Sequence, residues 1–254
     1  LLLRLIEGAG VFASYRYRDM PFLLTPMLWG QLSGPGRADL APRPRAHDDG
    51  MDIDIDSAEA FEEVVWRTHH PERYRGATLP VWPRKVDSEF KAFFDLQMRK
   101  IIALRREEQP GVSRYLSKNN GNIARLATIG RIAPDAVILV PYRNPIGQAA
   151  SLHRQHLNFL ELHGRDAFSK RYMEAIGHYD LGANLKPIAF PGSEAAAATR
   201  DYATLEAWLE YWCDAYGYLA GLNEPKLHFV SYDALCAAPE QVLGNLGRTL
   251  GLAE

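Results

Sequence analysis

A short apolar run, Val137 to Tyr142, is the clearest element in the hydrophobic pattern of the chain. Pro134-Asp135 precede the run and Asn144-Pro145 follow it, and an apolar run between turn residues is typical of a buried parallel strand. Asn144 is a favourable N-cap, and Pro145 suits the first position of a helix. Arg143 is therefore predicted where a strand ends and a helix begins. Open α/β sheets bind ligands at such points, and a cation beside a helix N-terminus favours phosphate.

Apolar periodicity predicts further strands and helices on both sides of this unit. Strands are predicted over 112–117 and 227–232, with an extended edge segment over 51–56. Helices are predicted over 1–8, 21–32, 57–68, 87–108, 121–132, 146–160, 199–222 and 239–250, with a helix and an insertion over 161–198. Because strands and helices alternate, we predict an α/β fold in which helices flank a parallel sheet with right-handed crossovers.

The composition is that of an ordinary globular protein, with 254 residues of which 47% are hydrophobic and 24% charged. A net charge of −2 does not indicate general nucleic-acid binding, so a basic site has to be local, as at Arg143. Cys213 and Cys236 are too few for a disulfide framework, and no signal peptide is visible, so we expect a cytoplasmic protein. No apolar run approaches the ~20 residues that a membrane span needs, and no span is expected.

Three segments that carry chemistry follow one another in a fixed order. The first is Tyr115-Leu-Ser-Lys118-Asn-Asn, a strand that ends in a lysine before a helix. The second is Val140-Pro-Tyr-Arg143-Asn-Pro145, with Ser151 eight residues after Arg143. The third is Val230-Ser-Tyr232-Asp233-Ala-Leu235, with Pro239 and Leu250-Gly251-Leu252 after it. In this order the segments resemble the sulfotransferases that use 3′-phosphoadenosine 5′-phosphosulfate (PAPS), in particular bacterial sulfotransferase-domain proteins.

The resemblance covers most of the chain and implies a fold, a reaction and a set of site residues. It implies one sulfotransferase domain over residues 1–254, with the P-loop NTPase-like fold of that family and PAPS as sulfate donor without a metal. Arg143 would grip the 3′-phosphate bidentately, and Ser151, two helical turns further on, would donate to the same phosphate. Lys118 would stabilise charge on the leaving group. The sulfuryl group would pass to a hydroxyl or amine acceptor.

The base that takes the acceptor proton has two candidates. Sulfuryl transfer needs in-line positioning and a base, by analogy with phosphoryl transfer. Asp19 follows the first helix, roughly where several branches of the family carry a catalytic carboxylate. His47 lies in a polar loop expected to rim the pocket, and its near-neutral intrinsic pKa suits a base. Both residues stand as candidates.

One element of the family is not found in the chain. The 5′-phosphosulfate loop joins the first strand to the first helix, and backbone N–H groups hold the ligand there. Leu1 to Ile6 resembles the helix that follows this loop, and no Gly-x-x-x-x-Gly-Lys-Ser/Thr occurs elsewhere. We therefore expect a fragment without its first strand and loop, which by itself binds PAPS poorly and is inactive.

Two other functions are compatible with the same pattern. A nucleotide-dependent kinase on a related fold would carry a Gly-Lys-Ser/Thr loop upstream. A non-catalytic relative would bind a partner through the irregular region 33–83, which in the sulfotransferase interpretation is an insertion that binds the acceptor. The acceptor is expected to be a small molecule, a glycan or a peptide. Asp52, Asp54 and Asp56 mimic a calcium loop, but the required glycine is missing.

Overall fold

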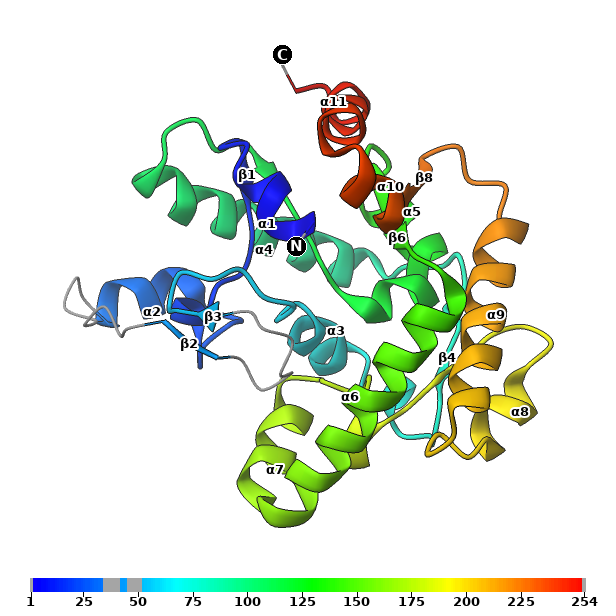
Figure 1. The fold of residues 1–254 in the computed structure, drawn as a ribbon. Helices are drawn as coiled ribbons and strands as arrows, with labels where there is room; N and C mark the ends of the chain where they lie inside the picture. Colours follow the sequence, from blue (N-terminus) through cyan, green and yellow to red (C-terminus); the bar gives the residue numbers. More distant parts are fainter. Residues whose placement is uncertain (1, 34–41, 45–51, 253–254) are drawn as a thin grey trace.

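The structure is a computed structural model that describes residues 2–33, 42–44 and 52–252 (Figure 1). Its α-helices are α1 (Leu2–Glu7), α2 (Pro26–Ser33), α3 (Glu63–His69), α4 (Ser88–Glu108), α5 (Leu126–Ile132), α6 (Pro145–Arg165), α7 (Ala167–Ala175), α8 (Glu194–Thr199), α9 (Leu205–Gly221), α10 (Tyr232–Ala237) and α11 (Pro239–Leu250). Its 3₁₀ helices are η1 (Tyr17–Asp19), η2 (Pro71–Tyr74), η3 (Asn120–Arg125) and η4 (Gly182–Asn184). Its strands are β1 (Phe12–Ala13), β2 (Arg43–Pro44), β3 (Asp52–Ile53), β4 (Leu79–Pro80), β5 (Arg114–Tyr115), β6 (Ile138–Tyr142), β7 (Ile188–Ala189) and β8 (Leu227–Ser231).

The strands of the described residues form small parallel sheets flanked by helices, as the alternating pattern predicts. β1 pairs with β5, β4 with β7 and β6 with β8, all parallel, and β2 pairs antiparallel with β3. The longest ladder joins β6 to β8, from Ile138 opposite Leu227 to Tyr142 opposite Ser231. The predicted single sheet is wrong in one respect, because these pairs remain separate two-stranded sheets.

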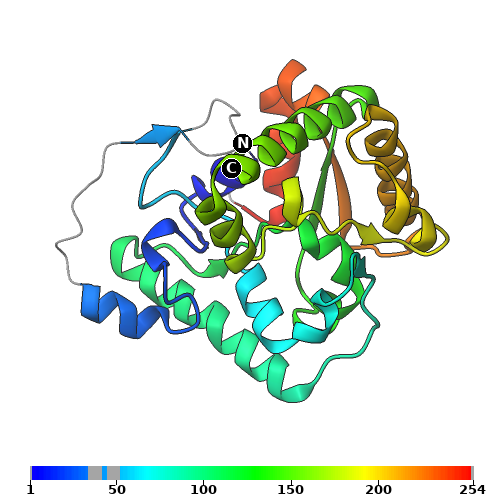
Figure 2. The same cartoon turned by 90° about the horizontal axis from the view of Figure 1, so that it is seen from below.

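Helical crossovers connect the parallel strands. η3 and α5 lead from β5 to β6, and the segment from α6 to α9 leads from β6 to β8. α6 packs against α9 and η4. Figure 2 shows α4 and α6 on opposite sides of the molecule with strands between them. The two long helices therefore act as outer layers, as the α/β pattern requires.

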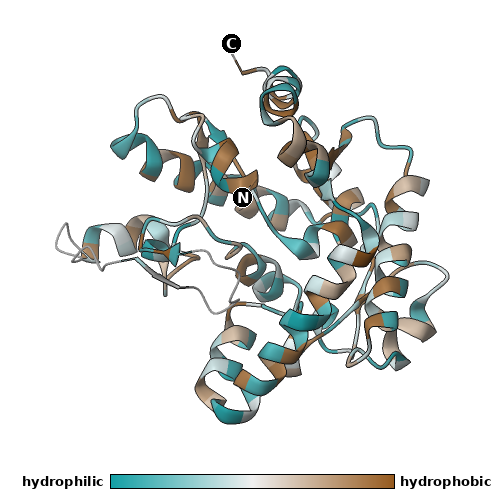
Figure 3. Ribbon diagram, viewed as in Figure 1, coloured by the Kyte–Doolittle hydropathy of each residue, from teal (hydrophilic) through white to brown (hydrophobic). Residues whose placement is uncertain are grey.

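Within the described residues, the core consists of three clusters of buried apolar side chains. The largest surrounds Trp66, which is 0% exposed, and includes Phe61, Phe90 and Phe94. A second cluster surrounds Trp208 between α6, α7 and α9. A third joins Ile6, Phe12 and Leu250 near the N-terminus. Figure 3 shows hydrophobic and hydrophilic residues alternating along α4 and α6, so these helices bury one face each.

Two predicted helices differ from the structure for local reasons. The helix predicted from residue 57 begins only at Glu63, because the backbone of 57–59 pairs with 15–17 instead: Tyr17 N donates to Ser57 O, and Glu59 N to Tyr15 O. The helix predicted over 199–222 begins only at Leu205, as α9, and the preceding Glu194–Thr199, predicted largely within the insertion, form the short helix α8. Thr204 forms the N-cap of α9, where its side chain accepts from Ala207 N, so the chain turns before that residue.

The strand predicted over 112–117 is shorter in the structure, and the helix predicted to end at residue 160 is longer. β5 pairs only at Arg114 and Tyr115. α6 continues to Arg165, and Asp166 then caps α7 by accepting from Phe168 N. Lys118 therefore lies three residues beyond the end of β5, in the loop that leads to η3.

A buried ion pair joins α3 to the end of η3. Arg125 and Glu63 are 1% and 5% exposed, and Arg125 Nη2 donates to Glu63 Oε2. The Tyr74 hydroxyl and Asn119 Nδ2 also donate to Glu63, and the Arg125 guanidinium lies 4.5 Å from the centre of the Trp66 ring. Burial alone would raise the pKa of Glu63, but the Arg125 charge and these hydrogen bonds lower it below its ordinary value.

Removing Arg125 should destabilise the fold strongly. The Arg125→Ala variant leaves the buried Glu63 carboxylate without its counter-charge, which costs about 3–5 kcal/mol of unfolding free energy. Urea unfolding followed by circular dichroism measures this. Arg131→Ala, an exposed position on the neighbouring α5, is the matched control and should stay within about 0.5 kcal/mol of wild type. Equal effects of the two substitutions would contradict the structural role of the pair.

Candidate functional site

Arg143 lies at the junction that the sequence predicts, between β6 and α6. Asn144 is the N-cap of α6, and its side chain accepts from Gly147 N at 3.2 Å. Pro145 is the first residue of the helix. The backbone N–H of Asn144 donates in turn to the Asp233 carboxylate of α10 at 3.0 Å. These bonds fix the backbone from which the Arg143 side chain projects, so the predicted strand end, cap and helix start are confirmed.

The Arg143 guanidinium has no carboxylate partner within the described ranges. It lies over the Tyr232 ring, 5.3 Å from the ring centre. Its Nε atom is buried and, within the same ranges, without a hydrogen-bond acceptor. A buried donor normally has a partner, and one without a partner marks a place where a ligand or ion can bind. The missing partner has to be an acceptor, and an anion meets that need best because the group is charged.

Arg143 precedes the N-cap of α6, and Gly147 and Ser151 follow Arg143 by four and eight residues, at a spacing that puts these two on one face of the helix. A Cβ atom at Gly147 would lie 3.4 Å from Arg143 Nη2, so the glycine leaves open the space between the guanidinium and the next turn. Ser151 is half-buried, and its hydroxyl has no hydrogen-bond partner among the residues that the structure describes. We call these three residues the α6 strip. It combines a cation, an open backbone surface and a hydroxyl donor, which suits a phosphate group.

A cavity of about 550 Å³ lies between β5 and β6, and we call it the inter-strand cavity. Leu116 and Tyr115 lie on one side of it, and Leu139 and Pro141 on the other. α1 and α5 contribute further apolar side chains to its wall, among them Leu2, Leu3, Ile6, Leu126, Ile129 and Ile132. No residue of β8 lines it, so the cavity lies on the side of β6 that faces away from the β6–β8 ladder.

The two strands direct unpaired peptide groups into this cavity. Arg114 N and Leu116 N donate to β1, so the N–H and C=O groups of Tyr115, which point to the opposite side, face away from β1. Ile138 N donates to Lys226 O toward β8, so the peptide groups of Leu139 face away from β8. Both sides of the cavity are therefore open strand edges, which can each pair with a further strand.

Lys118 lies at the rim of the inter-strand cavity. Its side chain is exposed, and Ser117, Asn119 and Asn120 line the cavity with it. Asn119 caps η3 by accepting from Gly121 N and also donates to Glu63, so the loop that carries Lys118 is attached to the buried ion pair. Lys118 belongs to the cavity lining and Arg143 does not.

Of the two candidate bases, Asp19 lies away from the inter-strand cavity. Asp19 is 4% exposed at the end of η1, and its carboxylate accepts from Arg105 and, at 2.8 Å, from Arg16 N. Arg105 is 2% exposed and donates also to Ser14 O, so the pair is part of the packing between η1 and α4. Neither residue lines the inter-strand cavity. His47 lies outside the described residues.

The sequence analysis did not single out Glu62, which lines the inter-strand cavity, or Gly147, which belongs to the α6 strip. Glu62 lines the inter-strand cavity, is 3% exposed, and accepts from Trp66 Nε1 at 2.8 Å and from the Tyr115 hydroxyl at 2.7 Å. Two adjacent acids inside the apolar stretch Phe61 to Trp66 are the signal that could have revealed it. Gly147 was also missed, although its position midway between Arg143 and Ser151 marks it.

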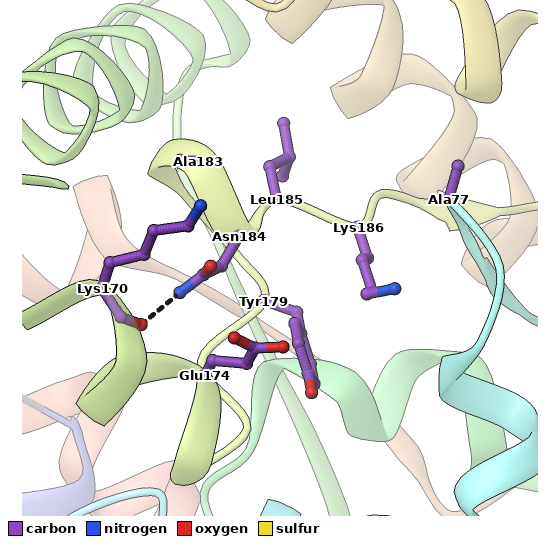
Figure 4. Close-up of a pocket in the computed structure, with 8 residues that line it drawn as sticks. All are labelled: Ala77, Lys170, Glu174, Tyr179, Ala183, Asn184, Leu185 and Lys186. Atoms are coloured by element: carbon purple, nitrogen blue, oxygen red, sulfur yellow. Dashed lines mark hydrogen bonds between the residues drawn. The ribbon is translucent and has the colours of Figure 1, made fainter. Parts of the chain in front are cut away.

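A shallow hollow of about 320 Å³ lies at η4, away from the predicted site residues (Figure 4). Lys186 and Lys170 border it, together with Glu174 and Tyr179. Lys186 Nζ donates to the carbonyl oxygens of Tyr74 and Gly76, at 2.9 and 2.6 Å. The lysine that could attract an anion is therefore used in holding the backbone, and the hollow does not resemble a built anion site.

Metal sites, membrane-spanning helices and known relatives complete the description of the chain. Nowhere in the described residues do three or more His, Cys, Asp or Glu side chains gather so that they could hold a metal ion. None of the helices in those ranges has the length and apolar character that a membrane crossing requires. Comparison with protein-family models, with curated proteins and with solved structures finds no match to the chain. These comparisons therefore assign the chain to no family.

The α6 strip should bind a phosphomonoester. Adenosine 3′-monophosphate is the probe, and amide chemical shifts of Gly147, Gln148 and Ser151 are the readout. Because a charge-assisted bidentate contact contributes about 1.5–3 kcal/mol, Arg143→Ala should weaken binding roughly 10- to 100-fold. Arg154→Ala removes the same charge from an exposed position of α6 and should change the affinity less than threefold.

Gly147→Ala provides a second variant for the same experiment. Alanine has the higher helix propensity, so this variant should be about 0.5–1 kcal/mol more stable, provided that helix formation dominates its effect. The new methyl group fills the space beside Arg143, so nucleotide binding should nevertheless fall. Shift changes that persist unaltered in both Arg143→Ala and Gly147→Ala would show that the strip is not the binding surface.

Proposed function

We propose that the chain is the greater part of a PAPS-dependent sulfotransferase that transfers a sulfuryl group to a hydroxyl or amine acceptor. The observation that carries the proposal is the unpaired guanidinium of Arg143 on the α6 strip. It occurs in the segment, Val140 to Pro145, whose sequence resembles the 3′-phosphate-binding segment of that family. A site of this composition suits a phosphomonoester that is recognised by charge and geometry, as a 3′-phosphate is.

In this proposal Arg143 and Ser151 hold the 3′-phosphate, and Lys118 approaches the bridging oxygen between sulfur and the 5′-phosphate. The acceptor oxygen or nitrogen forms a bond to sulfur while the bond from sulfur to that bridging oxygen breaks. Adenosine 3′,5′-bisphosphate leaves with the electron pair, and the acceptor proton passes to a base. Lys118 lowers the barrier because a cation beside the leaving oxygen stabilises the charge that develops there.

Of the two candidate bases, Asp19 fits the role poorly as it lies in the structure. Its carboxylate is engaged by Arg105 and by Arg16 N, and an acceptor would have to displace one of them. His47 is the candidate that the proposal keeps.

We further propose that a strand supplied by residues preceding Leu1 fills the inter-strand cavity. Most of the cavity wall is apolar, polar side chains such as Lys118 and Asn120 line the rest, and the peptide groups of Tyr115 and Leu139 are open on two sides. An extended apolar segment satisfies both edges and would join β1–β5 to β6–β8 as one parallel sheet. Such a segment followed by a phosphate-binding turn and α1 would complete the sulfotransferase fold that the resemblance implies.

Hydrogen exchange tests the strand. The chain extended at its N-terminus by the residues encoded upstream of Leu1 should show slowed exchange at Tyr115 N–H and Leu139 N–H relative to the 254-residue chain. Leu116 N–H and Ile138 N–H already donate within their ladders and serve as internal controls that change little. If Tyr115 and Leu139 exchange equally fast in both proteins, the strand does not fill the cavity.

Transfer of ³⁵S from PAPS tests the function. The extended protein should transfer label to a mixed set of hydroxyl and amine acceptors, and Arg143→Ala should lower kcat/KM for PAPS roughly 10- to 100-fold. Lys118→Ala should lower kcat more than it raises KM, because its contact strengthens in the transition state. Arg154→Ala should retain activity. An extended protein that binds PAPS without transferring label to any acceptor would instead favour the non-catalytic relative, and ATP-dependent labelling with ³²P would favour the kinase.

A further inference from the structure

Two buried histidines of α6 accept hydrogen bonds from consecutive backbone N–H groups of η4. Gly182 N donates to His156 Nδ1 at 3.0 Å, and Ala183 N donates to His163 Nδ1 at 3.1 Å. The two histidines are 5% and 6% exposed. A ring nitrogen accepts a hydrogen bond only when it carries no proton, so both rings are neutral, with the proton on Nε2.

We propose that this pair is a pH-sensitive latch that holds the turn over residues 181–184, the η4 turn, against α6. Protonation of either Nδ1 converts the acceptor into a donor that faces another donor. The hydrogen bond is then lost because two donors face each other, and for the buried Gly182 N–H this leaves a donor without a partner. Lowering the pH should therefore release the η4 turn. This inference does not depend on the proposed function.

The η4 turn packs closely against the two histidines of α6. Gly182 has a φ of +69°, and a Cβ atom there would lie 2.7 Å from Phe159 Cβ and 2.8 Å from His163 Nδ1. Glycine is required both for the backbone conformation and for the close approach to the histidine. His163 Nε2 is buried and has no hydrogen-bond partner in the described part of the chain. A protonated His163 would therefore gain nothing at Nε2 to offset the loss at Nδ1.

The charged groups around the two rings mostly oppose protonation. Burial lowers the pKa of His156, His153 lowers it further, and Asp201 acts in the opposite direction. Burial also lowers the pKa of His163, as do the neighbouring His178 and Lys170. Lys170 belongs to α7, and its carbonyl accepts from Asn184 Nδ2 at 2.8 Å, as Figure 4 shows. The lysine thus lies beside the turn that the histidines hold.

The direction of the pH effect follows from these shifts. Each histidine has a lower pKa in the folded protein than in an unfolded chain. At a pH just below the ordinary histidine pKa of about 6.5, the folded state therefore binds fewer protons than the unfolded state does. The stability of the closed latch is fully present above that value and is lost as the pH decreases through it toward the lowered folded pKa.

The latch is connected to the candidate site through Asp180. Asp180 is adjacent in sequence to the first residue of the η4 turn. Its carboxylate accepts a hydrogen bond from Asn120 Nδ2 at 3.0 Å. Asn120 follows Lys118 by two residues and lines the inter-strand cavity with it. Release of the η4 turn would loosen this bond, so the loop that carries Lys118 is expected to become more mobile at the same pH.

Backbone amide exchange tests the latch on the 254-residue chain. Protection factors, which correct for the intrinsic pH dependence of exchange, are compared at pH 7.5 and 5.5. Gly182 and Ala183 should lose at least tenfold in protection at pH 5.5, whereas Ile138 in the β6–β8 ladder should change less than threefold. Long-range ¹H–¹⁵N correlation spectra at pH 7.5 should show His156 and His163 as Nε2–H tautomers.

A variant that cannot be protonated supplies the decisive comparison. In the double variant His156→Asn, His163→Asn, the amide oxygens take over the position of Nδ1, so protection should remain at pH 7.5 and its loss at pH 5.5 should disappear. His228→Asn on β8 should leave the loss unchanged. Protection that does not respond to pH in wild type, or a loss that persists in the double variant, overturns the proposal. An Nδ1–H tautomer in the wild-type spectra overturns it too, even where the double variant fails to fold.

Discussion

The buried ion pair between Glu63 and Arg125 is the interaction on which the arrangement around the candidate site depends. Glu63 receives hydrogen bonds from Arg125, Tyr74 and Asn119, so one carboxylate joins α3, η2 and η3. The Lys118 loop is attached to it through Asn119. Gly177 also lies close to Glu63. Its φ of +78° favours glycine, and a Cβ atom at this position would lie only 2.6 Å from Glu63 Cγ. The cavity rim and the segment that leads to the η4 turn thus both lie against Glu63.

Three arginines in two environments differ in whether their charge is paired within the fold. Arg125 and Arg105 are almost fully buried, and each has a buried carboxylate partner, so their charges are used within the fold. Arg143 is half-buried, lies on an aromatic ring, and has no such partner in the described ranges. Burying a cation without a counter-charge is unfavourable, and a ligand anion removes that penalty. The absence of an internal partner among the described residues distinguishes Arg143 from the two paired arginines and is the reason it is proposed to bind a ligand.

Local signals in the sequence were enough to predict the parts of the site that local chemistry determines. The Asn144 cap, the Pro145 helix start and the placement of Arg143 follow from residues adjacent in the chain, and the structure has them as predicted. Asp19 was a candidate base because of its position after the first helix, and nothing in its neighbourhood reveals its partner Arg105, which is 86 residues away. The late start of α3 has the same kind of cause, since 57–59 pair with a distant segment around Tyr17. Tertiary pairing outweighed local propensity in both cases.

The predicted sheet is divided at β6, because one edge of this strand has no neighbouring strand among the described residues. Its run from Ile138 to Val140 has the composition of a strand buried on both sides, yet all three residues are only half-buried in the structure. β8 covers one edge of the strand, and the other edge faces the inter-strand cavity. An apolar strand with an unpaired edge is unfavourable in water. Its side chains stay partly exposed, and the peptide groups of that edge form no hydrogen bonds to a neighbouring strand. A strand between β5 and β6 would remove both deficits at once, and the apolar sequence of β6 is therefore better explained by a central strand than by the edge strand it forms here.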